Sequence, residues 1–202
     1  MPPNDSNNKG KAHSNFSFSE AASLCACAFF NDALDSYFFP CEADRISKQK
    51  RLYSYFLRAN AENISISSPQ LESLTIVEKP FEHKNIMSLA HGIPGLSLVK
   101  VGPISLSKMI YYQLNASTLR KRLIKDPYWY LALIATSPEY QRKGYARALL
   151  MPMLLKAEKK KEPFFLDTHN AKNISFYEKL GFRIIYAQAI GNMPFIHYCM
   201  IR

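Results

Sequence analysis

The sequence has few cysteines and no long apolar run, and these shortages argue against several classes of protein. Its four cysteines, Cys25, Cys27, Cys41 and Cys199, show neither C-x-x-C pairs nor C…H spacing, which argues against a zinc site and a disulfide framework. We therefore expect buried or half-buried free thiols in a reducing cytoplasm, and no bound metal. No apolar stretch reaches the roughly 20 residues of a membrane-spanning helix, and the polar N-terminus contains no apolar signal segment.

Acidic residues are also scarce, since 16 of them stand against 26 lysines and arginines, which gives a net charge of +10. A positive field attracts anionic small ligands, nucleic acids and acidic membrane surfaces alike. The basic residues are mostly scattered, without interleaved aromatics or a recognition-helix motif, and this is typical of a solvated surface. We therefore expect neither a nucleic-acid partner nor a membrane partner.

Length and composition predict one domain, because 202 residues with 48% hydrophobic side chains can bury a substantial core. Residues 1–15 are predicted to form a disordered tail, and residues 16–202 the domain. In its first half, a helix capped by Ser19 is predicted to run from Glu20 to the Phe38-Phe39-Pro40 stop, and a second helix is predicted at 44–61. A hairpin is predicted at 63–80. A substrate-facing insertion is predicted at 81–126, with a helix at 106–124.

An uncharged apolar run at 129–136 is typical of a strand that is buried on both faces, and Pro138 ends it. Helical spacing begins at Tyr145. The segment Gln141–Ala146, QRKGYA, therefore lies between the carboxyl end of a strand and the N-terminus of a helix.

This basic turn has the properties of an anion site. The first amides of a helix lack intrahelical partners, and the helix dipole is positive there. Gly144 lets a ligand approach the backbone closely, and Arg142 and Lys143 add positive charge. The turn is therefore predicted to bind pyrophosphate, although the GxxxxGK[ST] and GxGxxG patterns of common nucleotide-binding loops are both absent.

The second half continues with alternating elements. The helix after the turn contains Pro152, which would normally kink it, and Pro163 ends it before a strand at 164–168. Two strands joined by a helix pair in parallel with a right-handed crossover, and ligands bind at their carboxyl ends. A short helix closed by Gly181 and two further strands at 183–190 and 195–201 complete a mixed sheet.

Two blocks resemble the GNAT acetyltransferase superfamily. The turn QRKGYA is similar to the acetyl-CoA pyrophosphate loop of that family, and LDTHNAKNISFYEKLGF, at 166–182, is similar to the strand and helix that follow. The opening Tyr-Trp-Tyr-Leu at Tyr128 and the position of Pro152 further resemble the puromycin-acetyltransferase-like subgroup. The resemblance implies an α+β GNAT acyl-CoA N-acyltransferase fold, with a mixed sheet flanked by helices and a splayed parallel strand pair that forms the CoA cleft.

The resemblance also implies a set of site residues and acetyl-CoA as co-substrate. Tyr177 matches the tyrosine that serves as general acid, although it could also be a packed core aromatic. The residues implied in cofactor binding are Ile134, Ala135, Thr136, Gln141, Arg142, Lys143, Gly144, Tyr145, Ala146, Arg147, Asn170, Asn173 and Tyr177. For Asn170 and Asn173, helix capping is an alternative to contact with the pantetheine arm.

The general base is left open, because the strand that precedes the turn lacks the glutamate that many relatives carry. Asp167, His169 or a chain of waters could take the proton. Asp167 would need a pKa raised by burial, whereas the pKa of a histidine starts near neutrality. His169 could also be an ordinary loop histidine.

The predicted function is therefore the transfer of an acetyl group from acetyl-CoA to an amine of a small molecule. A protein or peptide N-acetyltransferase is one alternative, and a catalytically silent CoA-binding regulatory module is another. The expected partners are acetyl-CoA and the amine, and the protein is expected to be a monomer or a homodimer.

Overall fold

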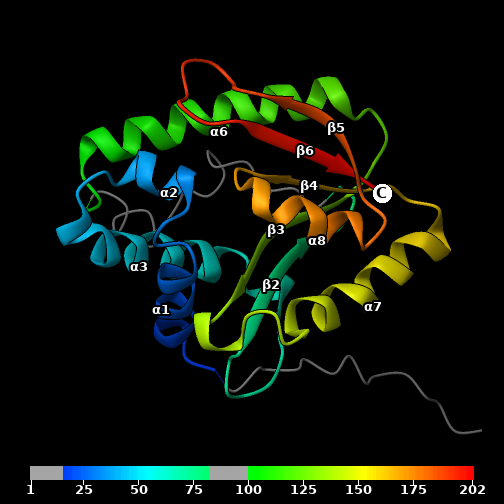
Figure 1. The fold of residues 1–202 in the computed structure, drawn as a ribbon, viewed down its shortest axis with the longest axis horizontal. Coiled ribbons are helices and arrows are strands. Elements are labelled where there is room, and N and C mark those ends of the chain that lie inside the picture. Colours follow the sequence, from blue (N-terminus) through cyan, green and yellow to red (C-terminus); the bar gives the residue numbers. More distant parts are fainter. Residues whose placement is uncertain (1–15, 82–99) are drawn as a thin grey trace, which may run out of the picture.

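The computed structural model describes residues 16–81 and 100–202, and a six-stranded sheet runs through its centre (Figure 1). The strand order is β1-β2-β3-β4-β6-β5, and β3 and β4 form the parallel pair in an otherwise antiparallel sheet. The strands are β1 Ile64–Ile66, β2 Ser73–Glu78, β3 Trp129–Thr136, β4 Phe164–Thr168, β5 Arg183–Gln188 and β6 His197–Ile201. The predicted mixed sheet is confirmed.

Helices cover both faces of the sheet (Figure 1). Leu133 packs with residues of α1 and α3 on one face, and Phe165 packs with residues of α6 on the same face. Trp129 and Leu166 pack with α7 and α8 on the other face. The helices are α1 Phe18–Ala28, α2 Ala33–Phe38, α3 Glu42–Ala59, α6 Pro103–Leu123, α7 Tyr145–Lys160 and α8 Ile174–Glu178, with single turns η1 Ala61–Asn63, η2 Pro138–Tyr140 and η3 Ala171–Asn173.

The predicted single helix from Glu20 to Phe38 is wrong, because the segment forms two helices. Ser17, not Ser19, caps α1 by accepting a hydrogen bond from the amide of Ser19 at 3.2 Å. The carboxylate of Asp32 accepts from the Leu34 amide at 2.9 Å and starts α2. Aspartate competes for backbone amides in this way, which favours a new cap over a continuous helix.

Two further predictions need correction. Cys27 and Cys41 are exposed, whereas Cys25 and Cys199 are buried, and all four are free thiols. The last two strands are shorter than predicted, since a turn over 189–196 separates β5 from β6. Helix α7, in contrast, continues through Pro152 on its exposed side. The predicted tail at 1–15 and residues 82–99 of the insertion lie outside the described residues.

A bulge in β3 determines where β3 and β4 separate. Ile76 of β2 pairs with Leu133, and the next residue, Val77, pairs with Leu131, so Ala132 is the extra residue. Leu131 and Leu133 consequently pack on opposite faces of the sheet. Among the described residues the pairing of β3 with β4 ends at Leu131 and Leu166, and the carboxyl ends of the two strands lie apart in Figure 1.

No helix in the described ranges 16–81 and 100–202 is long and apolar enough to cross a bilayer.

Candidate functional site

The turn between β3 and α7 has the backbone of an open anion site. Gly144 is the N-cap of α7 with φ of +91°, in the left-handed region, and no side chain caps the helix there. A Cβ built at Gly144 meets no atom within 4 Å. Arg142 also has positive φ, at +62°, and residues 141–144 are exposed. The first amides of α7 are therefore available to an external acceptor.

Charged side chains surround this helix terminus. Arg142, Lys143 and Arg147 are all exposed, and Lys143 Nζ lies 5.0 Å from the centre of the Tyr140 ring. The side-chain amide of Gln141 donates through Nε2 to the Thr136 carbonyl at 3.3 Å and so connects the turn to the end of β3. The positive charges and the helix dipole act on the same point, which favours a polyanionic group.

The end of β3 runs beyond Leu131, where its pairing with β4 stops, and borders the opening between the two strand ends. Ala135 is buried, and its side chain packs with α1 and α3 on the far face, so only its backbone faces the opening. The Thr136 hydroxyl hydrogen-bonds that of Ser73 at 2.9 Å. Ile134 is half-buried on the α7 face. These three positions thus offer mainly backbone groups to a ligand.

The segment after β4 borders the other side of the opening. The Asn170 side chain caps η3 by accepting a hydrogen bond from the Lys172 backbone amide at 3.0 Å. Of the two roles considered for this side chain, the structure shows helix capping. Asn173 is exposed and makes no capping hydrogen bond. Of the two asparagines, Asn173 has the side chain that is not used as a cap.

Tyr177 lies on α8 within the core between that helix and the sheet. It is 5% exposed, and its ring lies 5.2 Å from Phe176 and 6.0 Å from Phe182, measured between centroids. Burial raises the pKa of the Tyr177 hydroxyl far above its usual value. The hydroxyl consequently stays protonated at neutral pH. The residue is a packed aromatic, as the alternative reading proposed, and also a potential proton donor.

Asp167 lies on the opposite face of β4, under α6. Its carboxylate accepts hydrogen bonds from the Tyr130 hydroxyl at 3.2 and 3.4 Å. The guanidinium of Arg120 stacks over the Tyr130 ring at 4.4 Å. Asp167 is therefore an anchored, half-buried carboxylate next to the point where β3 and β4 separate.

His169, one residue beyond β4, contacts a second histidine. Its Nε2 lies 2.8 Å from Nδ1 of His197 and 3.1 Å from the Tyr112 hydroxyl. The pKa of His169 is lowered to about 4, chiefly by burial and also by His197, and Asp167 opposes both effects. Desolvation thus moves the pKa of His169 away from the near-neutral value at which a histidine starts.

Sequence reasoning missed His197, Tyr112 and Tyr130. One signal was present: Asp167 and His169 are two residues apart at the end of one predicted strand, and His197 lies in the last predicted strand. Residues two apart in a strand lie on the same face of a sheet.

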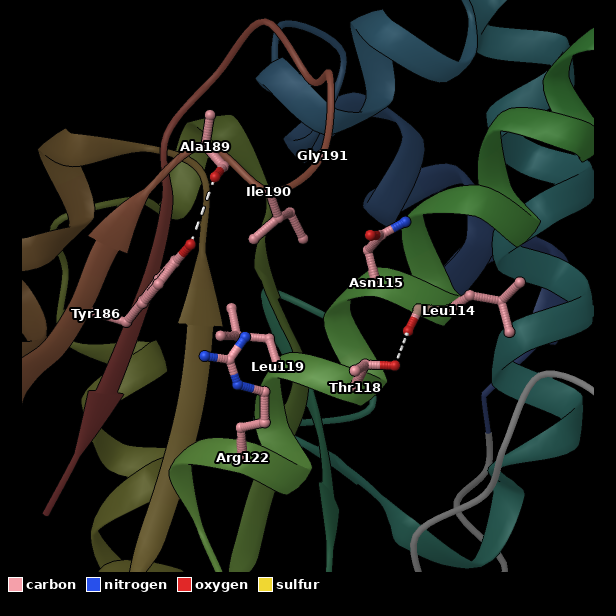
Figure 2. A pocket seen from close by; sticks show the side chains of 9 residues that line it. All are labelled: Leu114, Asn115, Thr118, Leu119, Arg122, Tyr186, Ala189, Ile190 and Gly191. Atoms are coloured by element: carbon pink, nitrogen blue, oxygen red, sulfur yellow. Dashed lines mark hydrogen bonds between the residues drawn. The ribbon is translucent and has the colours of Figure 1, made fainter.

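A separate groove of about 310 Å³ lies between α6 and the β5–β6 connection (Figure 2). None of the predicted site residues lines it. The Thr118 hydroxyl donates to the Leu114 carbonyl, and the Tyr186 hydroxyl donates to the Ala189 carbonyl. Arg122 is the charged residue of its lining. The groove is therefore distinct from the opening between β3 and β4.

Comparison with known proteins gives a family match and a relative that matches in part. The model of the acetyltransferase (GNAT) domain matches residues 111–184. An uncharacterized N-acetyltransferase of Schizosaccharomyces pombe is 33% identical over 76 residues, which are 38% of this chain and 29% of that protein. The chain therefore matches less than a third of the length of this relative.

Solved structures resemble the whole fold. The histone acetyltransferase HPA2 and related acetyltransferase from Corynebacterium glutamicum has a TM-score of 0.59 at 17% identity, with 91% of this chain and 89% of that chain covered. The C-terminal condensation domain of Ebony, in complex with beta-alanyl-dopamine, has a TM-score of 0.62 at 8% identity, with 92% and 93% covered. These likenesses show that the chain has the GNAT acyltransferase fold, and the family match makes residues 111–184 similar to the acetyltransferase (GNAT) domain.

Proposed function

We propose that this protein is an acetyl-CoA-dependent N-acetyltransferase that acts on an amine of a small molecule, with residues 16–202 as its single domain. One observation carries the proposal. The parallel strands β3 and β4 separate after three paired positions, and an uncapped, positively charged helix N-terminus follows β3 directly. Two separating strand ends beside such a helix terminus match a long ligand with a polyanionic end.

In this proposal the turn holds the pyrophosphate. The amides of Gly144, Tyr145 and Ala146 donate to it, and Gln141, Arg142, Lys143 and Arg147 surround it. Asn173 and the backbone of Asn170 bind the pantetheine arm from the β4 side. The backbone of Ile134, Ala135 and Thr136 lines the arm from the β3 side, and an amide near Ile134 stabilises the oxyanion that develops on the thioester carbonyl.

Tyr177 is the proposed general acid. A tyrosine hydroxyl is protonated at neutral pH, so it can give a proton to the departing thiolate.

Asp167 and His169 remain the proposed base candidates. Both lie at the carboxyl end of β4, on the face under α6. The nitrogen that attacks the thioester must lose a proton, and one of these groups accepts it.

Aromatic rings near this strand end support a small acceptor. Tyr37 lies 5.7 Å from Phe195, Phe38 lies 5.8 Å from Tyr112, and Tyr112 lies 5.4 Å from His169, between ring centroids. Aromatic side chains of this kind are typical of the lining of small-molecule sites. The narrower likeness to puromycin acetyltransferases stays a prediction.

The test is mass spectrometry of products formed from acetyl-CoA and a panel of small amines and peptides. We expect acetylated small amines, and loss of most product with Tyr177→Phe. Products on peptides alone would move the assignment to a protein N-acetyltransferase. Acetyl-CoA binding without any product would support the silent module.

A further inference from the structure

The contact between His169 and His197 follows from the register of β4 and β6. Asp167 pairs with Cys199 and Thr168 with Tyr198, so the same register places His169 opposite His197. Because side chains alternate between faces, both histidines project to the face of Asp167, under α6. Their facing nitrogens are 2.8 Å apart, a cross-strand hydrogen bond.

The protonation of the pair is restricted by its surroundings. His197 is 0% exposed, and its Nε2 has no hydrogen-bond partner in the described part of the chain. One proton lies between Nε2 of His169 and Nδ1 of His197. It belongs either to His169, which then donates, or to His197.

The Tyr112 hydroxyl indicates which ring donates. It lies 3.1 Å from the same Nε2 of His169. A neutral imidazole nitrogen without hydrogen has one lone pair, so two donors would compete for it. If Nε2 of His169 instead carries the hydrogen, it donates to Nδ1 of His197. The Tyr112 oxygen can then accept from the same N–H group. This arrangement leaves the lone pair of His169 on Nδ1.

We propose that His197 is a positioning residue that holds His169 in the Nε2–H tautomer, so that the Nδ1 lone pair of His169 accepts a proton from the acceptor amine as its nitrogen bonds to the thioester carbon. The assignment rests on the proposed function. In this step an N–H bond of the attacking nitrogen breaks and an Nδ1–H bond forms on His169. The nitrogen keeps the electron pair of the broken N–H bond. The imidazolium retains its Nε2–H bond to His197, and the carboxylate of Asp167 stabilises its charge.

The titratable groups that act on the pair come from several elements. Asp167 of β4 acts on both rings, and Arg120 of α6 acts on His197. Tyr112 of α6 contacts His169 directly, and Cys199 of β6 and Tyr130 of β3 interact with Tyr112. Burial dominates, and it lowers the pKa of both imidazoles. Both rings are accordingly neutral at pH 7, as a tautomer-based role requires.

Nitrogen NMR of the full-length, ¹⁵N-histidine-labelled protein tests the tautomer without any substrate. The chain has five histidines, and His169→Gln and His197→Asn assign the two signals. In the wild type at pH 7 we expect His169 to carry its hydrogen on Nε2 and none on Nδ1. In His197→Phe we expect the signals of His169 to show a mixture of the two tautomers. An Nδ1–H tautomer of His169, or an unchanged one in His197→Phe, would overturn the proposal.

Kinetics then test the consequence. His197→Phe is expected to lower kcat at least about tenfold and to leave the acetyl-CoA affinity, measured by calorimetry, unchanged. The side-chain carbonyl of asparagine can accept a hydrogen bond from Nε2–H of His169, so His197→Asn should recover part of the lost kcat. His169→Gln should remove the acidic limb of the kcat/KM profile. Tyr198→Phe, the next residue on β6, is the matched control and should keep wild-type kcat. Equal losses in His197→Phe and Tyr198→Phe would contradict a positioning role, whereas a wild type without turnover would refute the proposed function instead.

Discussion

At the residue scale, Tyr177 combines packing with chemistry. Its ring belongs to the core between α8 and the sheet, so Tyr177→Phe should fold normally. The loss of the hydroxyl removes the proposed proton donor, and we expect kcat to fall by about 10²-fold or more. Steady-state kinetics with acetyl-CoA and a reactive amine measure this. A Tyr177→Phe enzyme with wild-type kcat would exclude the role of this residue as general acid.

Asp35, on α2, gives the fold a pH dependence of its own. Burial raises the pKa of Asp35 to about 7, although its carboxylate accepts hydrogen bonds from Gln49 at 2.6 Å and from Tyr53 at 2.8 Å. In the unfolded chain an aspartate has a pKa of about 3.9. Between these values the folded protein binds more protons than the unfolded one, so the free energy of unfolding falls as pH rises.

We therefore expect Asp35→Asn to gain stability relative to the wild type between pH 4 and pH 8, by on the order of a few kcal/mol. The contribution of Asp35 is fully present below about pH 4 and is lost as pH rises through 7. Urea unfolding at a series of pH values measures this, with the exposed Asp126→Asn as control. If wild type and Asp35→Asn keep the same pH slope, Asp35 is not the responsible group.

At the element scale, the turn before α7 can be compared with the start of α6. Gly144 and Gly102 are both N-caps with φ above +90°, and a Cβ at either position meets no atom within 4 Å. Replacing either glycine by glutamate should strain the backbone by about 1–2 kcal/mol. Gly144→Glu alone also puts a negative charge at the phosphate position, so it alone should abolish acetyl-CoA binding in calorimetry. Equal binding by the two variants would contradict this site.

The same elements show what sequence reasoning could and could not reach. The turn at Gln141–Ala146 was predictable, because its residues, strand and helix are contiguous in sequence. The bulge at Ala132 was not predictable, because the i, i+2 spacing of Leu131 and Leu133 predicts that they share one face of the sheet. The bulge becomes evident only from the pairing of β3 with β2. The contact of His169 with His197 was equally hidden, since it depends on the register of strands 28 residues apart in sequence. The boundary between α1 and α2 was missed because a single Asp32 cap outweighed an apolar periodicity.

At the scale of the whole molecule, the net charge of +10 predicts a salt-dependent affinity for acetyl-CoA. Exposed charges are screened within about 10 Å at 0.1 M salt, so the dissociation constant should rise with salt. Arg142→Gln and Lys143→Gln should weaken binding and flatten this dependence, because these charges lie beside the helix terminus. Lys50→Gln, an exposed residue of α3, should leave the slope nearly unchanged. A slope that falls equally in all three variants would indicate general attraction by the net charge instead of a local site.

The most direct test of the central claim, an acetyl-CoA cleft where β3 and β4 separate, is calorimetric titration of acetyl-CoA into the wild-type protein. The claim predicts saturable binding of one acetyl-CoA per chain. A titration without any heat of binding, from protein that is folded by circular dichroism, would contradict it.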